Sequence, residues 1–355
     1  MIAITISGEH PHWRRAHERG ADTVKLSIMR TQSPILLVLL LVATTFAGCF
    51  GGGDDNPDRE DDPFNVPTWE IGDWWLYTFT TPEFSDDTAR LVVAENDTEE
   101  GTAYNLAISN HVEARRHAVL NHNPFLGRIT HDNLSAYENS VPQPIFQFPF
   151  QKGDSWNFTL FAVEWDADVL EVHIHNDGAT SYRTAVITAS ATDGSSLSYI
   201  FDEGAGFLRT LIWTDAEGVE QLNMQLATFG TGHEGEVWFI RGADLYAGSW
   251  DHDSGLPDAE IRDTFFVGDH PSGEEYDEMI YYLNAKMGGG TGSLTLRDHG
   301  SVSALERAWQ PGESEEGQLG EINAPSQEYT LTVTQSGDSE ISIIIAGGIS
   351  FSWVL

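Results

Sequence analysis

Cysteine and lysine are the residue types that this chain has least of. Its 355 residues include one cysteine, Cys49, and three lysines. A single cysteine excludes an intramolecular disulfide, so the fold must be held together by its apolar core. Basic residues number 18 against 55 acidic ones, for a net charge of −37 at pH 7. This charge repels nucleic-acid phosphates, and we therefore expect no nucleic-acid partner.

Long apolar runs are also scarce. The run at residues 34–43 is ten residues long, whereas a helix that spans a bilayer needs about 20 apolar residues. Two small residues, Ala47 and Gly48, then precede Cys49. This order resembles the signal peptide and lipobox of prokaryotic lipoproteins, with Phe46 where an aliphatic residue is usual. The resemblance implies cleavage before Cys49, a lipid on its sulfur and a location on the extracytoplasmic face of the cell membrane. An uncleaved membrane anchor is the alternative, and the short run disfavours it.

Residues 1–48 are accordingly predicted to be a signal peptide. Residues 1–28 are polar and mixed in charge, unlike an ordinary signal-peptide start, so we expect translation to begin at Met29. Residues 49–66 are predicted to be the lipidated cysteine and a flexible tether, because three glycines at 51–53 are followed by acidic and polar residues.

The part that follows residue 48 is still more acidic than the whole chain. Without the first 48 residues, which hold five basic and three acidic side chains, 13 basic and 52 acidic residues remain. Lys152 and Lys286 are the only lysines in this part. The composition resembles that of secreted proteins from salt-adapted archaea, in which dissolved salt screens the self-repulsion of the acidic surface.

Short β-branched and aromatic runs, bounded by Gly, Asp, Asn or Pro, dominate the chain after Pro67. They predict strands within 76–80, 89–94, 104–108, 156–161, 169–175, 182–188, 196–201, 206–213, 221–226, 237–240, 264–267, 279–285, 293–298, 329–333 and 340–347. Helical periods are few, and the best one runs from Val112 to Leu120. We therefore predict an all-β fold with minor helix, in which a curved antiparallel sheet or half-barrel (67–230) precedes a β-sandwich domain (236–355).

A nine-residue pattern, aromatic-x-x-Gly-Asp-x-Trp-x-aromatic, occurs at 69–77 and again 81 residues later at 150–158. Gly-Asp predicts a tight turn into a strand. The tryptophan and the aromatic residue two positions later share one strand face. We therefore expect both strands to supply large aromatic side chains to one core.

The second copy of this pattern lies within Phe148-Pro149-Phe150-Gln151-Lys152-Gly153-Asp154-Ser155-Trp156. A glycine-rich step into a strand, from Gly204 to Arg209, follows about 50 residues later. Together they resemble the lipoprotein-carrier-like (LolA/LolB-like) half-barrel proteins over about residues 67–228. The resemblance implies a curved antiparallel sheet with an apolar concave face. It carries over no ligand-contacting residue.

Three tryptophans are candidate ligand-binding residues. Trp74 and Trp75 are neighbours on a predicted strand and so point to opposite faces, and Trp156 takes the place of Trp75 in the second motif. Trp74 is the one expected to be exposed, where it would line a groove for an apolar ligand or a sugar. Most other tryptophans are expected in the core.

Two candidate metal sites also arise. His173 and His175 point to one face of a predicted strand and would chelate a transition metal, although a third ligand at defined spacing is missing. Asp251 and Asp253 have the oxygen-ligand character of a surface calcium site, without the fixed positions of an EF-hand loop. The plainer alternatives, a polar strand face and a solvated turn, are favoured for both, and we expect no cofactor.

Motifs that identify enzymes are absent from the sequence, which contains no Gly-x-Ser-x-Gly, no Walker loop and no His-Glu-x-x-His. Cys49 is assigned to the anchor, so no cysteine nucleophile remains. The preferred hypothesis is a non-enzymatic, lipid-anchored cell-surface protein that binds an apolar ligand or a protein or glycan partner. The alternatives are an extracellular hydrolase or its accessory module, since a pair of catalytic carboxylates leaves no sequence signature, and a purely structural envelope protein.

Overall fold

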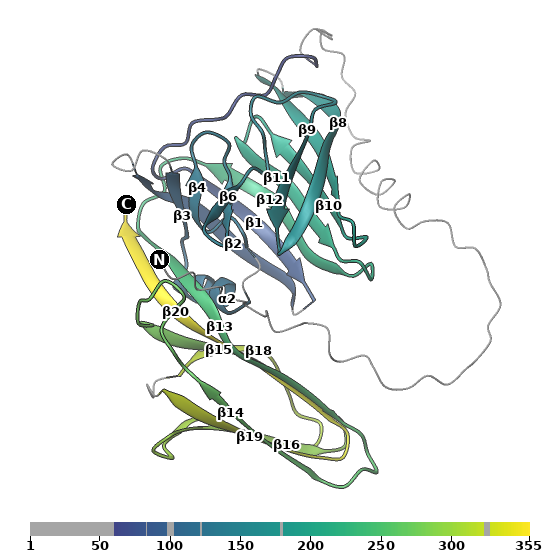
Figure 1. Cartoon of the computed structure of the whole chain (residues 1–355), viewed down its shortest axis with the longest axis vertical. Helices are drawn as coiled ribbons and strands as arrows, with labels where there is room; N and C mark the ends of the chain where they lie inside the picture. The colour runs from purple at the N-terminus through teal and green to yellow at the C-terminus, as the bar shows by residue number, and fades with distance from the viewer. Residues whose placement is uncertain (1–59, 83, 98–102, 121–122, 178–179, 323–326) are drawn as a thin grey trace, which may run out of the picture. The chain divides into compact units, whose positions relative to one another are not determined.

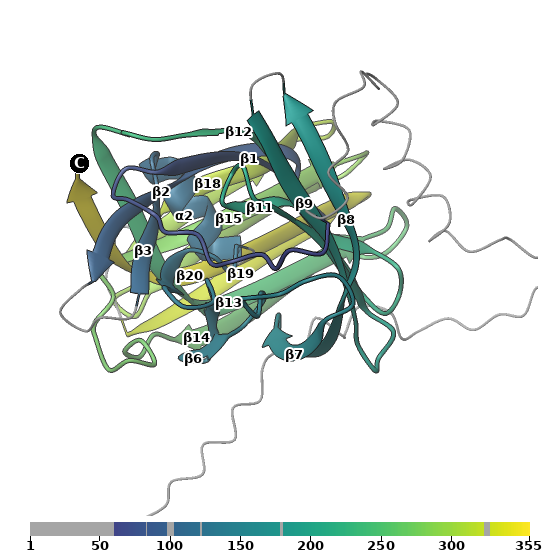
Figure 2. The same cartoon turned by 90° about the horizontal axis from the view of Figure 1, so that it is seen from above.

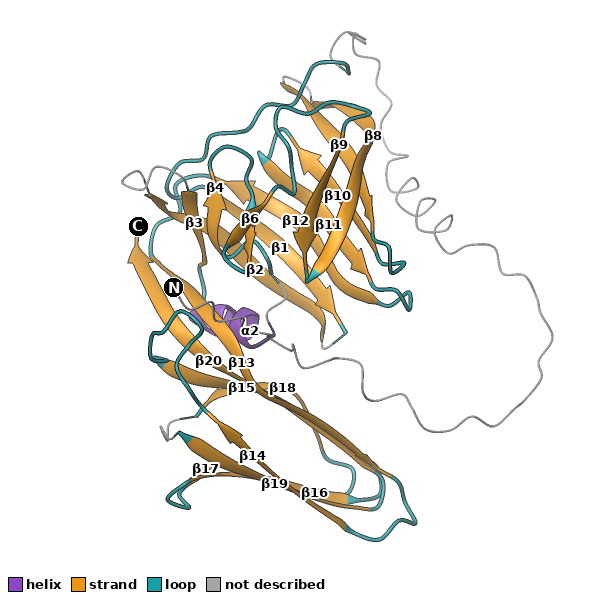
Figure 3. Cartoon of the chain, viewed as in Figure 1, coloured by secondary structure: helices purple, strands orange, loops and turns teal. Residues whose placement is uncertain are grey.

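The structure is a computed structural model that describes residues 60–82, 84–97, 103–120, 123–177, 180–322 and 327–355 (Figure 1). The predicted signal peptide, Cys49 and the tether up to residue 59 lie outside the described residues. Strands dominate the described chain, which contains one helix (Figure 3). The prediction of an all-β fold with minor helix is confirmed.

The chain from Trp74 to Gly230 contains twelve strands and the helix. They are β1 (Trp74–Thr81), β2 (Phe84–Asp97), β3 (Ala103–Ile108), α2 (His111–Leu120), β4 (Gly127–Thr130), β5 (Ala136–Glu138), β6 (Val141–Gln143), β7 (Ser155–Leu160), β8 (Val163–Asp177), β9 (Thr180–Ser190), β10 (Ser196–Asp202), β11 (Phe207–Thr214) and β12 (Glu220–Gly230).

Eight further strands follow the short segment 231–235. They are β13 (Glu236–His252), β14 (Ala259–Phe266), β15 (Glu278–Met287), β16 (Thr291–Asp298), β17 (Ser303–Trp309), β18 (Ser314–Glu321), β19 (Glu328–Ser336) and β20 (Ser339–Val354).

One antiparallel sheet runs through both parts of the chain, in the order β18-β15-β20-β13-β3-β2-β1-β12-β11-β10-β9-β8-β7, with β4 added at β3. The predicted boundary at 230–236 falls between β12 and β13, and the two parts join where Trp238 of β13 pairs with Ile108 of β3. Figure 2 shows the part from β1 to β12 curling around the segments that connect its strands. That 67–230 and 236–355 are separate domains stays a prediction.

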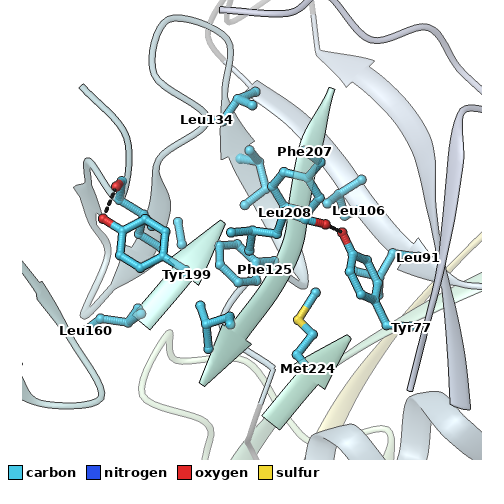
Figure 4. Packing of buried hydrophobic residues seen from close by; sticks show 14 of the residues in the cluster. Tyr77, Leu91, Leu106, Phe125, Leu134, Leu160, Tyr199, Phe207, Leu208 and Met224 are labelled. Atoms are coloured by element: carbon cyan, nitrogen blue, oxygen red, sulfur yellow. Dashed lines mark hydrogen bonds between the residues drawn. The ribbon is translucent and has the colours of Figure 1, made fainter. Parts of the chain in front are cut away.

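The inner face of the curved part is covered by the segment that connects α2 to β7 and contains the short strands β4, β5 and β6. Phe125, Leu134 and Phe146 from this segment are 0% exposed and belong to one core with the inward-facing side chains of the strands. Phe125 packs against Phe207 of β11, and the Tyr199 hydroxyl of β10 donates to the Ile145 carbonyl at 2.7 Å (Figure 4). The apolar concave face that the LolA/LolB-like resemblance implies is thus covered by other side chains of the chain.

The two Gly-Asp motifs form the same turn. Gly72 and Gly153 have φ of +89° and +88°, a region that glycine enters without steric penalty. In each turn the aspartate accepts a hydrogen bond from the backbone N–H three residues earlier, at 2.8 Å for Asp73 and 2.9 Å for Asp154. Both glycine N–H groups then donate to a carbonyl of the next strand at 2.9 Å. Since both motif tryptophans reach the main core, the prediction of two aromatic strands in one core is confirmed.

The glycine-rich step before β11 is held by aromatic side chains of the first motif. Nε1 of Trp69 donates to the Gly206 carbonyl at 3.0 Å, and Nε1 of Trp75 donates to the Ala205 carbonyl at 2.8 Å. The Tyr77 hydroxyl donates to the Leu208 carbonyl at 2.6 Å (Figure 4). The first motif and the glycine-rich step are therefore one structural unit, built from residues about 130 positions apart.

Arg183 of β9 fixes the first described residues to the curved sheet. It is 4% exposed, its Nη1 donates to the Asp62 carbonyl at 2.6 Å, and it pairs with Glu203 at 2.8 Å. Its guanidinium also lies 4.2 Å from the ring centroid of Phe64. Phe64 in turn exchanges two backbone hydrogen bonds with Phe150. The prediction that the flexible tether extends to residue 66 is therefore wrong for its last residues, because Asp62 and Phe64 are held on the fold by hydrogen bonds and Phe64 is buried.

Helix α2, which matches the predicted Val112–Leu120 period, links the two parts of the large sheet through Arg115. This side chain pairs with Glu278 of β15 at 2.6 Å and with Glu321 of β18 at 2.9 Å. The helix also approaches β13 closely, because a Cβ at Gly242 would lie 2.3 Å from the carbonyl oxygen of Ala118. Only glycine fits at that position.

Arg116 on the same helix holds two carboxylates together. Its Nη1 lies 2.6 Å from Asp87 of β2 and 2.7 Å from Glu113. Burial and the neighbouring Asp87 raise the pKa of Glu113 to about 7, against the opposing charge of Arg116. The cluster is an ion-pair network inside the fold.

The last part of the chain forms the predicted β-sandwich. A four-stranded sheet, β14-β19-β16-β17, packs against the β18-β15-β20-β13 end of the large sheet. The core between them contains Leu283, Leu294 and Val333, all 0% exposed.

The sequence missed or shortened several strands. β17 and β18 were not predicted, and β18 (SEEGQLGE) carries no apolar alternation because it is the edge of the large sheet, where polar residues and glycine discourage further pairing. β13 is 17 residues long, against a prediction of four, because beyond Ile240 buried and exposed positions do not alternate regularly along it. Among the described residues no helix is long and apolar enough to cross a membrane.

Candidate interaction surface

The three tryptophans proposed for ligand binding do not meet on one surface. Trp75 is 3% and Trp156 is 5% exposed, and both are packed in the main core. Trp74 is half-buried on the opposite face of the sheet. Their alternation along the strands is as predicted, but the inner face that carries Trp75 and Trp156 is covered by other side chains of the same core.

The His173–His175 pair lies on β8, where each ring has a protein neighbour. Nε2 of His173 lies 3.3 Å from Glu171, and both side chains are more than half exposed. Nε2 of His175 lies 3.0 Å from the Thr184 hydroxyl, and its ring stacks on Tyr182 at 5.0 Å. Burial and the charge of Arg209 lower the pKa of His175. Within the described ranges no three His, Cys, Asp or Glu side chains are grouped so as to hold a metal ion.

Asp251 and Asp253 are exposed beside a buried histidine that uses both of its ring nitrogens. His252 is 6% exposed; its Nδ1 lies 2.6 Å from the Gly337 carbonyl and its Nε2 lies 2.9 Å from the Pro257 carbonyl. A carbonyl only accepts, so both hydrogen bonds form only when each ring nitrogen carries a proton, that is, when the ring is an imidazolium. These two bonds, with smaller contributions from Asp258 and Asp253, raise the pKa of His252.

We expect the His252 contacts to weaken as the pH rises. Because the folded pKa exceeds the unfolded value of about 6.5, their stabilising effect is complete below that pH and is lost as the pH passes the folded pKa. Backbone hydrogen exchange of residues 253–256, corrected for the intrinsic rate, should therefore speed up as the pH rises above 6.5. In a His252→Gln variant the corrected rates should not change with pH. Equal pH dependence in both proteins would contradict the assignment.

A separate group of aromatic side chains lies on the outer face of the large sheet. Trp74, Phe239 and Trp353 pack around a small buried cluster, and Phe351 stacks on Phe239 at 5.9 Å and on Trp353 at 6.4 Å. The buried cluster beneath them consists of Val92, Ala94, Ala107 and Val237. We call the four aromatic residues the aromatic face.

Strand register brings the aromatic face together. Trp74 pairs with Val92, and Val92 pairs with Ala107 on the next strand. Phe239 pairs with Phe351, and β13 joins β3 beside them. Five adjacent strands, β1, β2, β3, β13 and β20, therefore carry it (Figure 1). At about 4.8 Å per strand the row is roughly 19 Å wide.

Two arginines lie over the rings of the aromatic face. The guanidinium of Arg90 lies 4.5 Å from the ring centroid of Trp74, and that of Arg241 lies 5.4 Å from Phe351. Arg241 pairs with Glu274, whereas Arg90 forms no ion pair with any residue that the structure describes. Nε of each is buried without a hydrogen-bond acceptor among the described residues. In a chain with three acidic residues for every basic one, an arginine without a carboxylate partner is a candidate contact for an anionic group.

Sequence patterns did not indicate these residues as part of a site: Arg90, Phe239, Arg241, Phe351 and Trp353. The available signal was alternation, because Phe239 and Arg241, like Phe351 and Trp353, are two residues apart and so share a strand face. The predicted strands ended at residues 240 and 347 and so left out Arg241, Phe351 and Trp353.

No protein-family model matches the chain, and no curated protein matches it. Among solved structures, the MucA/MucB complex of Pseudomonas aeruginosa shares 10% identity, with 75% of this chain and 88% of that chain covered and a TM-score of 0.24. The insecticidal delta-endotoxin Cry8Ea1 of Bacillus thuringiensis shares 7% identity, with 80% and 54% covered and a TM-score of 0.19. An exo-beta-1,3-galactanase of Phanerochaete chrysosporium shares 8% identity, with 73% and 78% covered and a TM-score of 0.18. Similarities this low carry no conclusion about function.

Proposed function

We propose that this protein is a non-enzymatic, lipid-anchored protein of the cell surface that makes its contacts through its outer faces. The anchor is inferred from the lipobox-like sequence around Cys49 and the acidic segment after it. The aromatic face is the candidate contact surface, since it combines half-buried rings with an arginine that lacks a carboxylate partner.

The observation that carries this proposal is the filled inner face of the curved sheet. A carrier of apolar ligands needs an apolar space, yet Phe125, Leu134 and Phe146 are 0% exposed against the strands. This favours a partner outside the sheet over a ligand held within it. Solvent extraction of the purified soluble part, residues 54–355, should accordingly yield no bound lipid, and a stoichiometric lipid would contradict this part of the proposal.

The alternative of a hydrolase requires two carboxylates at an open cleft. Asp87 and Glu113 are the described pair whose environment raises a carboxyl pKa toward neutrality. Arg116 pairs with both of them, however, and the cluster lies between α2 and β2. A group engaged in this way is better suited to stabilising the fold than to proton transfer, so the non-enzymatic function is preferred.

The anchor has a direct test in cells of the native host or a close relative. The wild-type protein should fractionate with membranes and be released by detergent, whereas Cys49→Ser should abolish lipid attachment and move most of the protein out of the membrane fraction. A matched control, Ser109→Ala, should fractionate like the wild type. Unchanged membrane association of the Cys49→Ser variant would contradict lipid anchoring.

A further inference from the structure

We propose that the aromatic face docks on the membrane that carries the lipid of Cys49, so that the protein lies against the bilayer on the outer side of β1, β2, β3, β13 and β20. This inference rests on the proposed lipid anchor. It goes beyond the anchor, because it assigns one surface of the fold and one partner, the lipid headgroup layer.

The side-chain chemistry fits the membrane interface. Tryptophan is enriched where a bilayer meets water, because its ring is apolar and its N–H is polar. Trp74 and Trp353 supply two such rings, Phe239 and Phe351 add apolar area between them, and all four are half-buried and so accessible. The rings of Phe239, Phe351 and Trp353 stack with interplanar angles of 18° and 20°. Peripheral binding grows with buried apolar area together with attraction to anionic headgroups.

Charge selects this face over the rest of the molecule. The chain carries −37 overall, so most of its surface is repelled by anionic headgroups. Arg90 and Arg241 lie over the rings of the aromatic face, and Arg90 has no carboxylate partner among the described residues. A lipid phosphate supplies the oxygen acceptors that a guanidinium binds in bidentate fashion.

The length of chain before the described fold allows the contact. Eleven residue steps separate Cys49 from Glu60, which corresponds to at most about 40 Å when extended. A domain of about 300 residues has a radius of gyration of roughly 19 Å. The attachment at Asp62, fixed by Arg183, therefore leaves enough chain for the fold to turn this face toward the bilayer.

The test uses Cys49 as the only thiol of the chain. The protein from Cys49 to Leu355 is coupled by maleimide to a phospholipid in vesicles that contain phosphatidylglycerol, and side-chain exposure is read by hydroxyl-radical footprinting with mass spectrometry. Oxidation of Trp74 and Trp353 should fall several-fold on coupling. Oxidation of Phe266, which is 71% exposed on β14, should not change.

Variants with matched controls sharpen the result. Phe351→Ser combined with Trp353→Ser should restore the oxidation of Trp74 on vesicles, and so should Arg90→Gln, which removes the charge without removing an aromatic ring. Phe266→Ser and Arg262→Gln, on the exposed strand β14, should leave the protection intact. Melting temperatures identify any variant that fails to fold, and Arg90→Gln then decides the outcome.

Equal oxidation of Trp74 and Trp353 with and without vesicles would overturn the proposal. So would protection by a soluble acidic polysaccharide but not by vesicles, which would make the face a glycan site. The maleimide link replaces the natural lipid, so this assay is independent of the native anchor. Failure of native lipidation would appear instead as an unmodified Cys49 in cells.

Discussion

Replacing Trp75 with alanine should destabilise the fold by about 3–5 kcal/mol, the range for truncating a large buried aromatic side chain. Trp75 is 3% exposed, lies 4.8 Å from the Trp69 ring and donates to the buried carbonyl of Ala205. A domain is typically stable by only about 5–15 kcal/mol, so this loss should be visible as a large fall in the urea midpoint.

The two motif tryptophans provide a matched pair that separates packing from hydrogen bonding. Trp75→Phe leaves the Ala205 carbonyl without its donor, a loss of about 1–3 kcal/mol beyond the smaller ring. Nε1 of Trp156 is buried without an acceptor among the described residues, so Trp156→Phe removes an unpaired donor and should destabilise the protein less. Urea unfolding of both variants measures the difference. Equal losses would contradict the assigned role of the Trp75 bond.

Lowering the pH from 7 to 5 should destabilise the protein by about 2 kcal/mol through His117 alone. This residue is 2% exposed and packs against Phe79 at 4.8 Å; burial, with a smaller effect of Arg116, lowers its pKa to about 3. The unfolded chain binds a proton near pH 6.5 and the folded chain does not. The stabilising effect is therefore complete above pH 6.5 and is lost progressively as the pH falls toward 3.

Glu113 on the same helix acts in the opposite direction, because its raised pKa favours folding as the pH falls from 7. The His117 contribution must therefore be taken as a difference between proteins. On going from pH 7 to pH 5, the change in the free energy of unfolding should be about 2 kcal/mol more unfavourable in the wild type than in His117→Gln, while His173→Gln, at an exposed position, should follow the wild type. Parallel losses in wild type and His117→Gln would contradict the buried neutral histidine.

Local sequence patterns predicted which residues form strands, turns and the helix better than they predicted which of these elements contact one another. The Gly-Asp turns, the helix near residues 112–120 and most strands follow from glycine placement and side-chain alternation, which depend on neighbours in sequence. β18 escaped because an edge strand needs no apolar face. That Trp75 and Trp69 bond the glycine-rich step could not be predicted, since the partners are about 130 residues away.

The candidate site shows the same limit. Alternation predicted that Trp74 and Trp75 point to opposite faces, but not that a segment with only short strands, around Phe125 and Phe146, would cover the inner one. The aromatic face depends on β13 and β20 pairing over more than 100 residues, which places Phe239 beside Phe351. No single one of these side chains indicates a site in the sequence. The register between neighbouring strands brings them together on one face of the sheet.

The mass of the first peptide of the protein isolated from its own membranes tests the central claim most directly. The account predicts that this peptide begins at Cys49 and carries a covalent lipid, with no peptide recovered from residues 1–48. An N-terminus upstream of Cys49, or a free thiol at Cys49, would contradict the lipid anchor on which the proposed function depends.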